Sequence, residues 1–222
     1  MDMILQLFTN GGIVMIPLFG LSIFAIAMIL ERSLFWLKLN RNQAKIIKKG
    51  LRMYPEEPEM AKALFERYQH LPIPRIFLAA LNLRRPTPEK FRLALESAAQ
   101  AEIPLLKRFS NSFEIVTSVS PLLGLLGTVL GLITALAALR IGDIEASQTT
   151  GVTGGISEAL TSTAAGLVIA IFTLFFASMF RGLYLQQIAL IQEVSSQLEL
   201  LHLDRYELDN YEQQGEKQDA LT

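Results

Sequence analysis

Three long apolar stretches interrupt an otherwise polar chain of 222 residues. They cover residues 11–30, 115–139 and 156–180; the first two contain no charged residue and the third contains one, Glu158. A helix rises ~1.5 Å per residue, so about 20 apolar residues cross the ~30 Å hydrocarbon core of a bilayer. The pattern therefore predicts an all-α membrane protein with three transmembrane helices, of which the second and third have helical extensions outside the membrane.

The polar segments between the spans are predicted to be helical where apolar residues recur at helical spacing. Residues 31–114 form a helical loop, with a helix that begins at Thr87-Pro88, a capping residue followed by proline in the first turn. Pro104 is expected to kink or end that helix. After this start, helical spacing relates five residues that lead into the second span: Phe91, Leu95, Ala98, Glu102 and Leu105.

The C-terminal part divides into an amphipathic helix and an acidic tail. Residues 181–203 place four apolar residues on one face, namely Ile191, Val194, Leu198 and Leu201. Residues 204–222 hold six acidic residues against Arg205 and Lys217, and this composition favours disorder. Both helical extensions are expected to pack on each other as a stalk.

Positive charge gives the orientation. Of the 20 lysines and arginines, 16 lie between Arg32 and Arg108, none precedes the first span, and residues 140–155 hold only Arg140. Lys and Arg concentrate on the cytoplasmic side of membrane proteins. We therefore expect a periplasmic N-terminus (residues 1–10), a cytoplasmic loop (31–114), a short periplasmic loop (140–155) and a cytoplasmic C-terminus. The segment before the first span lacks the basic residues of a signal peptide, so that span is expected to remain as an anchor.

Composition narrows the chemistry. The chain is 51% hydrophobic and 18% charged, has no cysteine, and carries its two histidines, His70 and His202, outside the spans. Disulfide and thiolate chemistry are excluded. The spans contain no Ser-Lys or Asp pair, so we expect no enzyme, metal site or cofactor. A net charge of −1 gives no indication of a nucleic-acid partner.

The second and third spans each carry a stripe of small residues at alternating steps of four and three, the spacing of neighbours on one helix face. The stripes consist of Thr117, Pro121, Gly124, Thr128, Gly131, Ala135 and Ala138 in the second span, and of Ala159, Thr163, Gly166, Ala170, Thr173 and Ala177 in the third, with Ser162 beside the latter. Two interpretations remain open. Small residues, including the Gly127-xxx-Gly131 pair, permit close helix packing, whereas the threonine hydroxyls suit a polar path or a partner-facing surface.

Glu158 favours the polar path. A charged side chain costs about 2.5–3.5 kcal/mol at the bilayer centre on insertion scales, so an acid within a span is a functional candidate. The alternative is that Glu158 lies at the interface, in a first helical turn where the helix dipole favours an anion. It lies about 100° around the helix from Ala159, at the edge of the small stripe.

Two segments resemble the MotA/TolQ/ExbB proton-channel family. They are Ser-Pro-Leu-Leu-Gly-Leu-Leu-Gly-Thr-Val-Leu-Gly at 120–131 and Ile-Ser-Glu-Ala-Leu-Thr-Ser-Thr-Ala-Ala-Gly-Leu-Val-Ile-Ala-Ile at 156–171, and Glu31-Arg32 after the first span is similar too. Three spans favour the ExbB/TolQ-like branch over the flagellar MotA proteins. One departure is Phe172, where the family often has proline, and it implies a straighter third helix.

The resemblance implies a pentamer in the bacterial inner membrane whose second and third spans line a pore. A single-span partner resembling ExbD or TolR would sit in that pore, carry the proton-accepting aspartate, and use proton flow for transport or envelope work. By motif position, Thr128 and Thr163 match the pore threonines and Glu158 the glutamate of the third span. We thus expect a proton path along Thr128, Thr163, Glu158, Ser162 and Thr173, and close packing at Gly124, Gly127, Gly131, Gly166 and Ala170.

One carboxylate near one end of a span cannot form a complete proton relay, so a partner has to supply the deeper acid. A passive oligomeric scaffold, whose small stripes only pack helices, is the alternative that the sequence leaves open.

Overall fold

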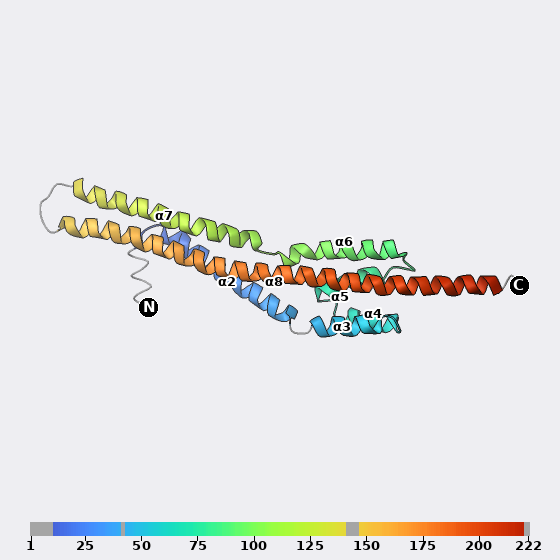
Figure 1. Ribbon diagram of the computed structural model, residues 1–222. Coiled ribbons are helices and arrows are strands. Elements are labelled where there is room, and N and C mark those ends of the chain that lie inside the picture. Colours follow the sequence, from blue (N-terminus) through green and yellow to red (C-terminus); the bar gives the residue numbers. More distant parts are fainter. Residues whose placement is uncertain (1–10, 41–42, 141–146, 220–222) are drawn as a thin grey trace. The chain divides into compact units, whose positions relative to one another are not determined.

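The computed structural model describes residues 11–40, 43–140 and 147–219, and these residues form helices joined by turns (Figure 1). The helices are α2 (Met15–Asn40), α3 (Gln43–Met53), α4 (Pro58–Arg67), α5 (Pro72–Leu81), α6 (Pro88–Leu106), α7 (Ser110–Arg140) and α8 (Ser147–Asp219). Three apolar windows long enough to cross a membrane lie in the regions of α2, α7 and α8. The predicted all-α fold with three transmembrane helices is confirmed.

The helices extend beyond the predicted spans because the edge of a membrane does not end a helix. Helix α2 continues past Glu31 and Arg32 to Asn40, and α8 begins at Ser147, nine residues before the predicted span. Helix α8 also runs through the acidic segment to Asp219, so the expected disorder of residues 204–219 is corrected. Once a helix is nucleated, each further residue adds a hydrogen bond, and Leu, Glu, Gln and Lys extend it readily. Residues 220–222 and 141–146 lie outside the described part.

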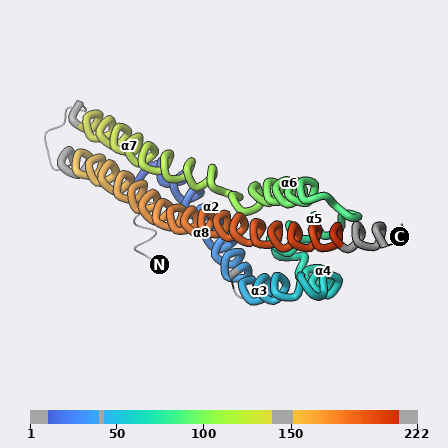
Figure 2. Tube along the Cα trace, turned by 45° about the vertical axis from the view of Figure 1, so that its right-hand side comes forward, coloured from blue at the N-terminus to red at the C-terminus, as the bar shows by residue number. Residues whose placement is uncertain are grey.

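The chain divides into two compact units, and the first comprises the described parts of Met1–Ser33 and Phe109–Arg181. In this unit α7 and α8 run side by side, as Figures 1 and 2 both show. Gly131 lies beside Gly155, whereas the earlier Gly124 lies beside the later Ser162. The two helices are therefore antiparallel. Val14, just before α2, and Met15 and Leu18 in its first turn pack against residues of both helices.

The second unit comprises Leu34–Arg108 and Gly182–Thr222 as far as they are described. Its core is made of large side chains: the rings of Phe65 and Phe77 meet edge to face with centroids 5.1 Å apart, and Ile73 and Ile76 are fully buried. Gly50 of α3 leaves room for the ring of Phe65 from α4. Helix α4 contributes two buried residues to this core, Ala61 and Phe65.

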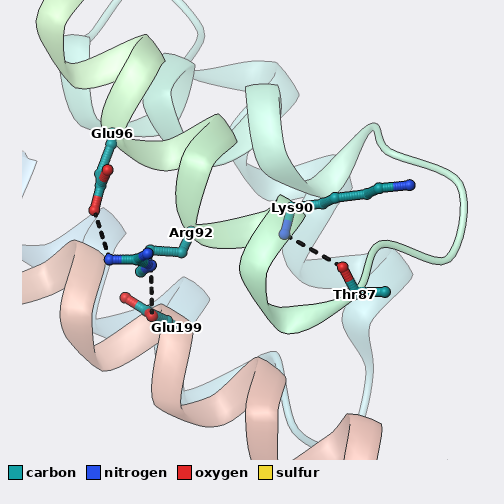
Figure 3. Close-up of polar contacts among 5 residues, drawn as sticks. All are labelled: Thr87, Lys90, Arg92, Glu96 and Glu199. Atoms are coloured by element: carbon teal, nitrogen blue, oxygen red, sulfur yellow. Dashed lines mark hydrogen bonds and ion pairs between the residues drawn. The ribbon is translucent and has the colours of Figure 1, made fainter.

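Helix α6 begins as predicted. Thr87 caps it by accepting a hydrogen bond from the Lys90 amide at 3.4 Å (Figure 3). Pro88 follows in the first turn. Arg92 of α6 contacts Glu96 on the same helix at 3.4 Å and Glu199 of α8 at 4.0 Å. These pairs are exposed and add little stability, but they show which face of α6 meets α8.

Two details of the helical stripes differ from the sequence interpretation. Helix α6 passes through Pro104 and ends two residues later, and its last buried residue is Leu106, not Leu105. On α8, Ile191, Val194 and Leu198 are buried as expected, but the next buried position is His202, with Leu201 half-buried. In both helices the inward-pointing side chain lies four residues after the preceding buried one: Leu106 follows Glu102, and His202 follows Leu198.

Candidate functional site

The small stripes of α7 and α8 meet within one chain. A Cβ atom at Gly131 would lie 2.6 Å from the carbonyl oxygen of Gly155, and one at Gly166 would lie 2.5 Å from that of Ser120. Cβ atoms in proteins do not approach heavy atoms so closely, so nothing larger than glycine fits at either position without movement. The backbones of the two helices thus touch, the arrangement that small residues permit in membranes.

The other positions expected in this contact lie along it. A Cβ at Gly124 would be 3.0 Å from the Ser162 carbonyl oxygen, and one at Gly127 would overlap the Ser162 side chain. Ala170 is buried at 7% exposure, and Ala135 and Ala159 are also buried. The close contact therefore extends over several turns of both helices.

Two hydroxyl groups of α8 bond across this contact. Thr163 Oγ1 donates to the carbonyl oxygen of Gly124 at 3.1 Å. Ser162 Oγ lies 2.9 Å from the Ala159 carbonyl of its own helix and 3.4 Å from that of Gly124. Ser162 is fully buried, whereas Thr163 is only partly buried and keeps some of its surface open.

The remaining two threonines differ in exposure. Thr128 is partly exposed on α7 and its hydroxyl donates to the Leu125 carbonyl at 2.6 Å. Thr173 is 1% exposed and its hydroxyl donates to the Ile169 carbonyl at 2.7 Å. Assembly with other chains can bury more surface but cannot expose Ser162 or Thr173. In the described arrangement Ser162 and Thr173 are buried among the helices, whereas Thr128 and Thr163 keep some surface open.

Glu158 turns toward the first span. Its side chain is half-buried, and its carboxylate lies directly against the Cα of Gly12, just before α2. Its helix neighbour Ala159 packs against Gly131 of α7. The structure thus brings Thr163 to the α7–α8 contact and places Glu158 at the contact of α8 with the start of α2.

The comparison with known proteins agrees with these features. A model of the MotA/TolQ/ExbB proton channel family matches residues 68–193, which include both small stripes. This chain belongs to the MotA/TolQ/ExbB proton channel family. Its members are transport and channel proteins. With its apolar helices, the chain is a multi-pass membrane protein of this family.

Relatives place it in the ExbB-like branch. ExbB-like 3 of Synechocystis sp., whose name refers to biopolymer transport, is 52% identical over 192 residues, covering 86% of this chain and 91% of the relative. ExbB-like 1 of the same organism is 40% identical, with coverages of 90% and 79%. An ExbB homologue of Methanothermobacter thermautotrophicus is 26% identical, with coverages of 76% and 59%.

Arg32 is a buried charge of the first unit that the sequence placed at the end of a span. It is 2% exposed, pairs with Glu31 at 2.8 Å, and its guanidinium lies 5.6 Å from the centroid of the Phe109 ring. Phe109 precedes α7 and has a φ of 67°, a left-handed conformation that phenylalanine rarely adopts. Arg32 therefore packs against the turn from which α7 starts.

The second unit holds a buried polar cluster that sequence reasoning missed. Tyr54 donates its hydroxyl to His202 Nδ1 at 3.0 Å, His202 Nε2 donates to the Pro86 carbonyl at 3.2 Å, and the Phe91 ring stacks on the imidazole with centroids 3.9 Å apart. A carbonyl can only accept, so Nε2 carries the hydrogen of the neutral ring. The spacing of His202 from Leu198 was the available signal.

Burial shifts the ionisation of this cluster. Burial lowers the pKa of His202 from its ordinary value of 6.5; nearby Arg205 lowers it further, while the bond to Pro86 and the charge of Asp209 oppose this. Burial also raises the pKa of Tyr54. Both effects favour the neutral forms, which are the forms that this hydrogen-bond arrangement requires.

Proposed function

We propose that this chain is the proton-conducting subunit of an ExbB/TolQ-like motor in a bacterial inner membrane. Five copies surround the single span of an ExbD/TolR-like partner, and proton flow between them is coupled to transport or envelope work. The N-terminus faces the periplasm, and the second unit and the C-terminus face the cytoplasm, as the concentration of basic residues in 32–108 indicates. Membership in the family supports the role as a motor subunit. The geometry of Thr128 and Thr163 supports their place in the proton path.

The observation that carries the proposal is the hydrogen-bonding state of Thr128 and Thr163. Each hydroxyl donates its only hydrogen to a backbone carbonyl, of Leu125 and Gly124 respectively, and each side chain retains some exposure. A hydroxyl has one donor and two acceptor lone pairs. These two groups therefore present lone pairs, which can accept a hydrogen bond from water or from a protonated carboxylic acid.

This arrangement suits a partner whose acid gains and loses a proton. Pore-lining groups that only accept hydrogen bonds interact with the protonated acid. Groups that donate hydrogen bonds would instead stabilise the ionised carboxylate and hold it in place. A membrane potential of 100 mV supplies about 2.3 kcal/mol per elementary charge. No site along the path can therefore bind the proton with a free energy much more favourable than that. The described spans contribute one acid of their own, Glu158, at the outer end, and the partner supplies the deeper acid.

Removing the two hydroxyls tests the proposal. Thr128→Val with Thr163→Val keeps the side-chain shape and removes both acceptors. The complex with its partner should assemble, and its proton flux in vesicles under an imposed potential should fall at least tenfold. Thr134→Val is the matched control, because this exposed hydroxyl of α7 also bonds its own helix, at 3.0 Å to Leu130. It should leave flux unchanged.

Thr163→Ser separates chemistry from packing. Serine keeps the hydroxyl that bonds Gly124 and loses only a methyl group, so it should retain most of the flux. Wild-type flux in the double valine variant would contradict the role of the threonines.

A passive scaffold is the second candidate, and the α7–α8 contact is the observation that favours it. Backbone contact at Gly131 and Gly166 explains both glycines without any conduction. The scaffold predicts that no condition produces flux while glycine replacements still disrupt assembly. Flux that depends on Thr128 and Thr163 excludes it.

A further inference from the structure

The segment before α2 contains a glycine whose bare Cα faces the acid of the third span. Gly12 has a φ of +69°, in the left-handed region that favours glycine, and the carboxylate of Glu158 lies against it. A Cβ atom at position 12 would overlap Oε1, and would lie 2.5 Å from the carboxylate carbon and 3.0 Å from Cγ of Glu158. Any other residue at this position therefore moves the carboxylate.

The same geometry makes the site selective. The atoms that a new Cβ would meet are the far end of one flexible side chain, so the helices need not separate. At Gly131 and Gly155 a Cβ would instead meet backbone atoms at 2.5–2.8 Å, which cannot move alone. A side chain at position 12 thus displaces Glu158 with little effect on the packing of α7 and α8.

The location gives the contact a physical consequence. The carbonyl of Gly12 accepts the first hydrogen bond of the turn that begins α2, from the Met15 amide at 3.1 Å. The carboxylate therefore lies at the N-terminal end of a long helix, where amide groups and the helix dipole attract negative charge. Val14 and Met15, directly after it, are buried against the other two helices and fix this end of α2.

We propose that Gly12 is a positioning residue for Glu158: it admits the carboxylate to the N-terminal end of α2 and so makes the first span part of the outer entrance of the proton path. The functional half of this inference rests on the function proposed above. The first span then has a role besides anchoring the chain, because the residue just before it receives the carboxylate of the third span.

The first test measures the position of the acid and needs no conduction. A hydrophobic carbodiimide is added to the assembled complex, and labelling of Glu158 is followed by mass spectrometry. Gly12→Ala should raise the labelling rate several-fold, because the displaced carboxylate loses the shelter of the backbone. Gly20→Ala, within α2, is the control, since a Cβ there meets nothing within 4 Å. Equal labelling in wild type and Gly12→Ala would overturn the inference.

The second test is a double-mutant cycle on proton flux in vesicles. Gly12→Ala should reduce flux to the level of Glu158→Gln, and the double variant should be no slower than Glu158→Gln alone. Alanine at a left-handed position carries backbone strain, but that strain is equal in both backgrounds. A further reduction in the double variant would show a purely structural role and overturn the proposal.

Labelling tests whether Gly12 positions Glu158, and flux tests whether the complex conducts protons. Absence of flux in the wild-type complex contradicts the proposed function, and the labelling result then still decides whether Gly12 positions Glu158. Wild-type flux in Gly12→Ala together with changed labelling overturns the role of this contact in conduction and leaves the proposed function intact.

Discussion

The two units hold their helices together by opposite means. In the first, α7 and α8 touch through glycine backbones and through a hydroxyl of Thr163 that bonds a carbonyl. In the second, helices meet through large side chains such as Phe65 and Phe77, and through the ion pair of Arg75 with Glu102 at 2.6 Å. Lipid offers no hydrophobic drive to join helices, whereas water does, so close backbone approach replaces apolar burial.

The difference predicts how each unit fails. A contact made of backbone is broken by adding atoms, and a core of large side chains is broken by removing them.

Adding a side chain to the first unit should have the largest effect. Gly155→Leu places its side chain where even a Cβ would lie 2.5 Å from the Gly131 carbonyl oxygen, so the helices must separate and no monodisperse oligomer should be recovered. Gly131→Leu and Gly166→Leu should act alike. The control is the adjacent Gly154→Leu, because nothing lies within 4 Å of a Cβ there. Size-exclusion profiles that do not distinguish positions 154 and 155 would refute the backbone contact.

Removing a side chain from the second unit should come next. Phe65→Ala empties a fully buried site and should cost about 3–5 kcal/mol. Hydrogen exchange should accelerate in α3, α4 and α5 and stay unchanged in α7. Met60→Ala, at a position 56% exposed on the same helix, is the matched control. Equal loss of protection in α7 would mean that the two units do not open separately.

Acidity should loosen the second unit through His202. The lowered pKa means that the folded state binds fewer protons than the opened state. Stability from this group is therefore present above pH 6.5 and is lost as the pH falls from 6.5 through the folded-state pKa. Hydrogen exchange around residues 198–206, corrected for intrinsic rates, should show this loss.

His202→Gln removes the titration while it can still donate to the Pro86 carbonyl and accept from Tyr54. Its exchange should lack the acid-dependent step. A step of the same size in this variant would assign the pH dependence to another group.

The surface ion pairs should matter least. Arg92→Ala breaks the contacts with Glu96 and Glu199, in which every side chain is at least 36% exposed. Exposed pairs contribute about 0–1 kcal/mol, so thermal unfolding should shift by no more than a degree or two. A large shift would mean that the α6–α8 contact depends on charge and not on Phe91 and Leu198.

Local patterns were sufficient to predict the spans and the small stripes. Apolar runs identify spans by length alone, and steps of four and three identify the face that holds Gly131 and Gly166. The contact of Gly12 with Glu158 could not be predicted, because it depends on where α2 packs and joins residues far apart in the sequence. The burial of Thr173 and Ser162 could not be predicted for a related reason, because a hydroxyl side chain occurs both on open helix faces and in helix contacts.

Residue type also led to two wrong predictions in the second unit, one about a buried position and one about the end of a helix. Leucine outranks histidine in apolar character, so Leu201 was preferred to His202, although helical spacing from Leu198 favours the latter. The acidic composition after Leu203 indicated disorder, yet a helix already formed through 203 continues into it. In both cases the position of a residue along a helix determined its structure more than its polarity did.

The partner-completed proton path is the central claim, and its most direct test is flux with and without the partner. This chain is reconstituted in vesicles alone, with an ExbD/TolR-like single-span partner, and with that partner after its span aspartate is changed to asparagine. Under an imposed potential the wild-type complex should conduct protons, and the other two preparations should match empty vesicles. Equal proton flux from this chain alone would contradict the account.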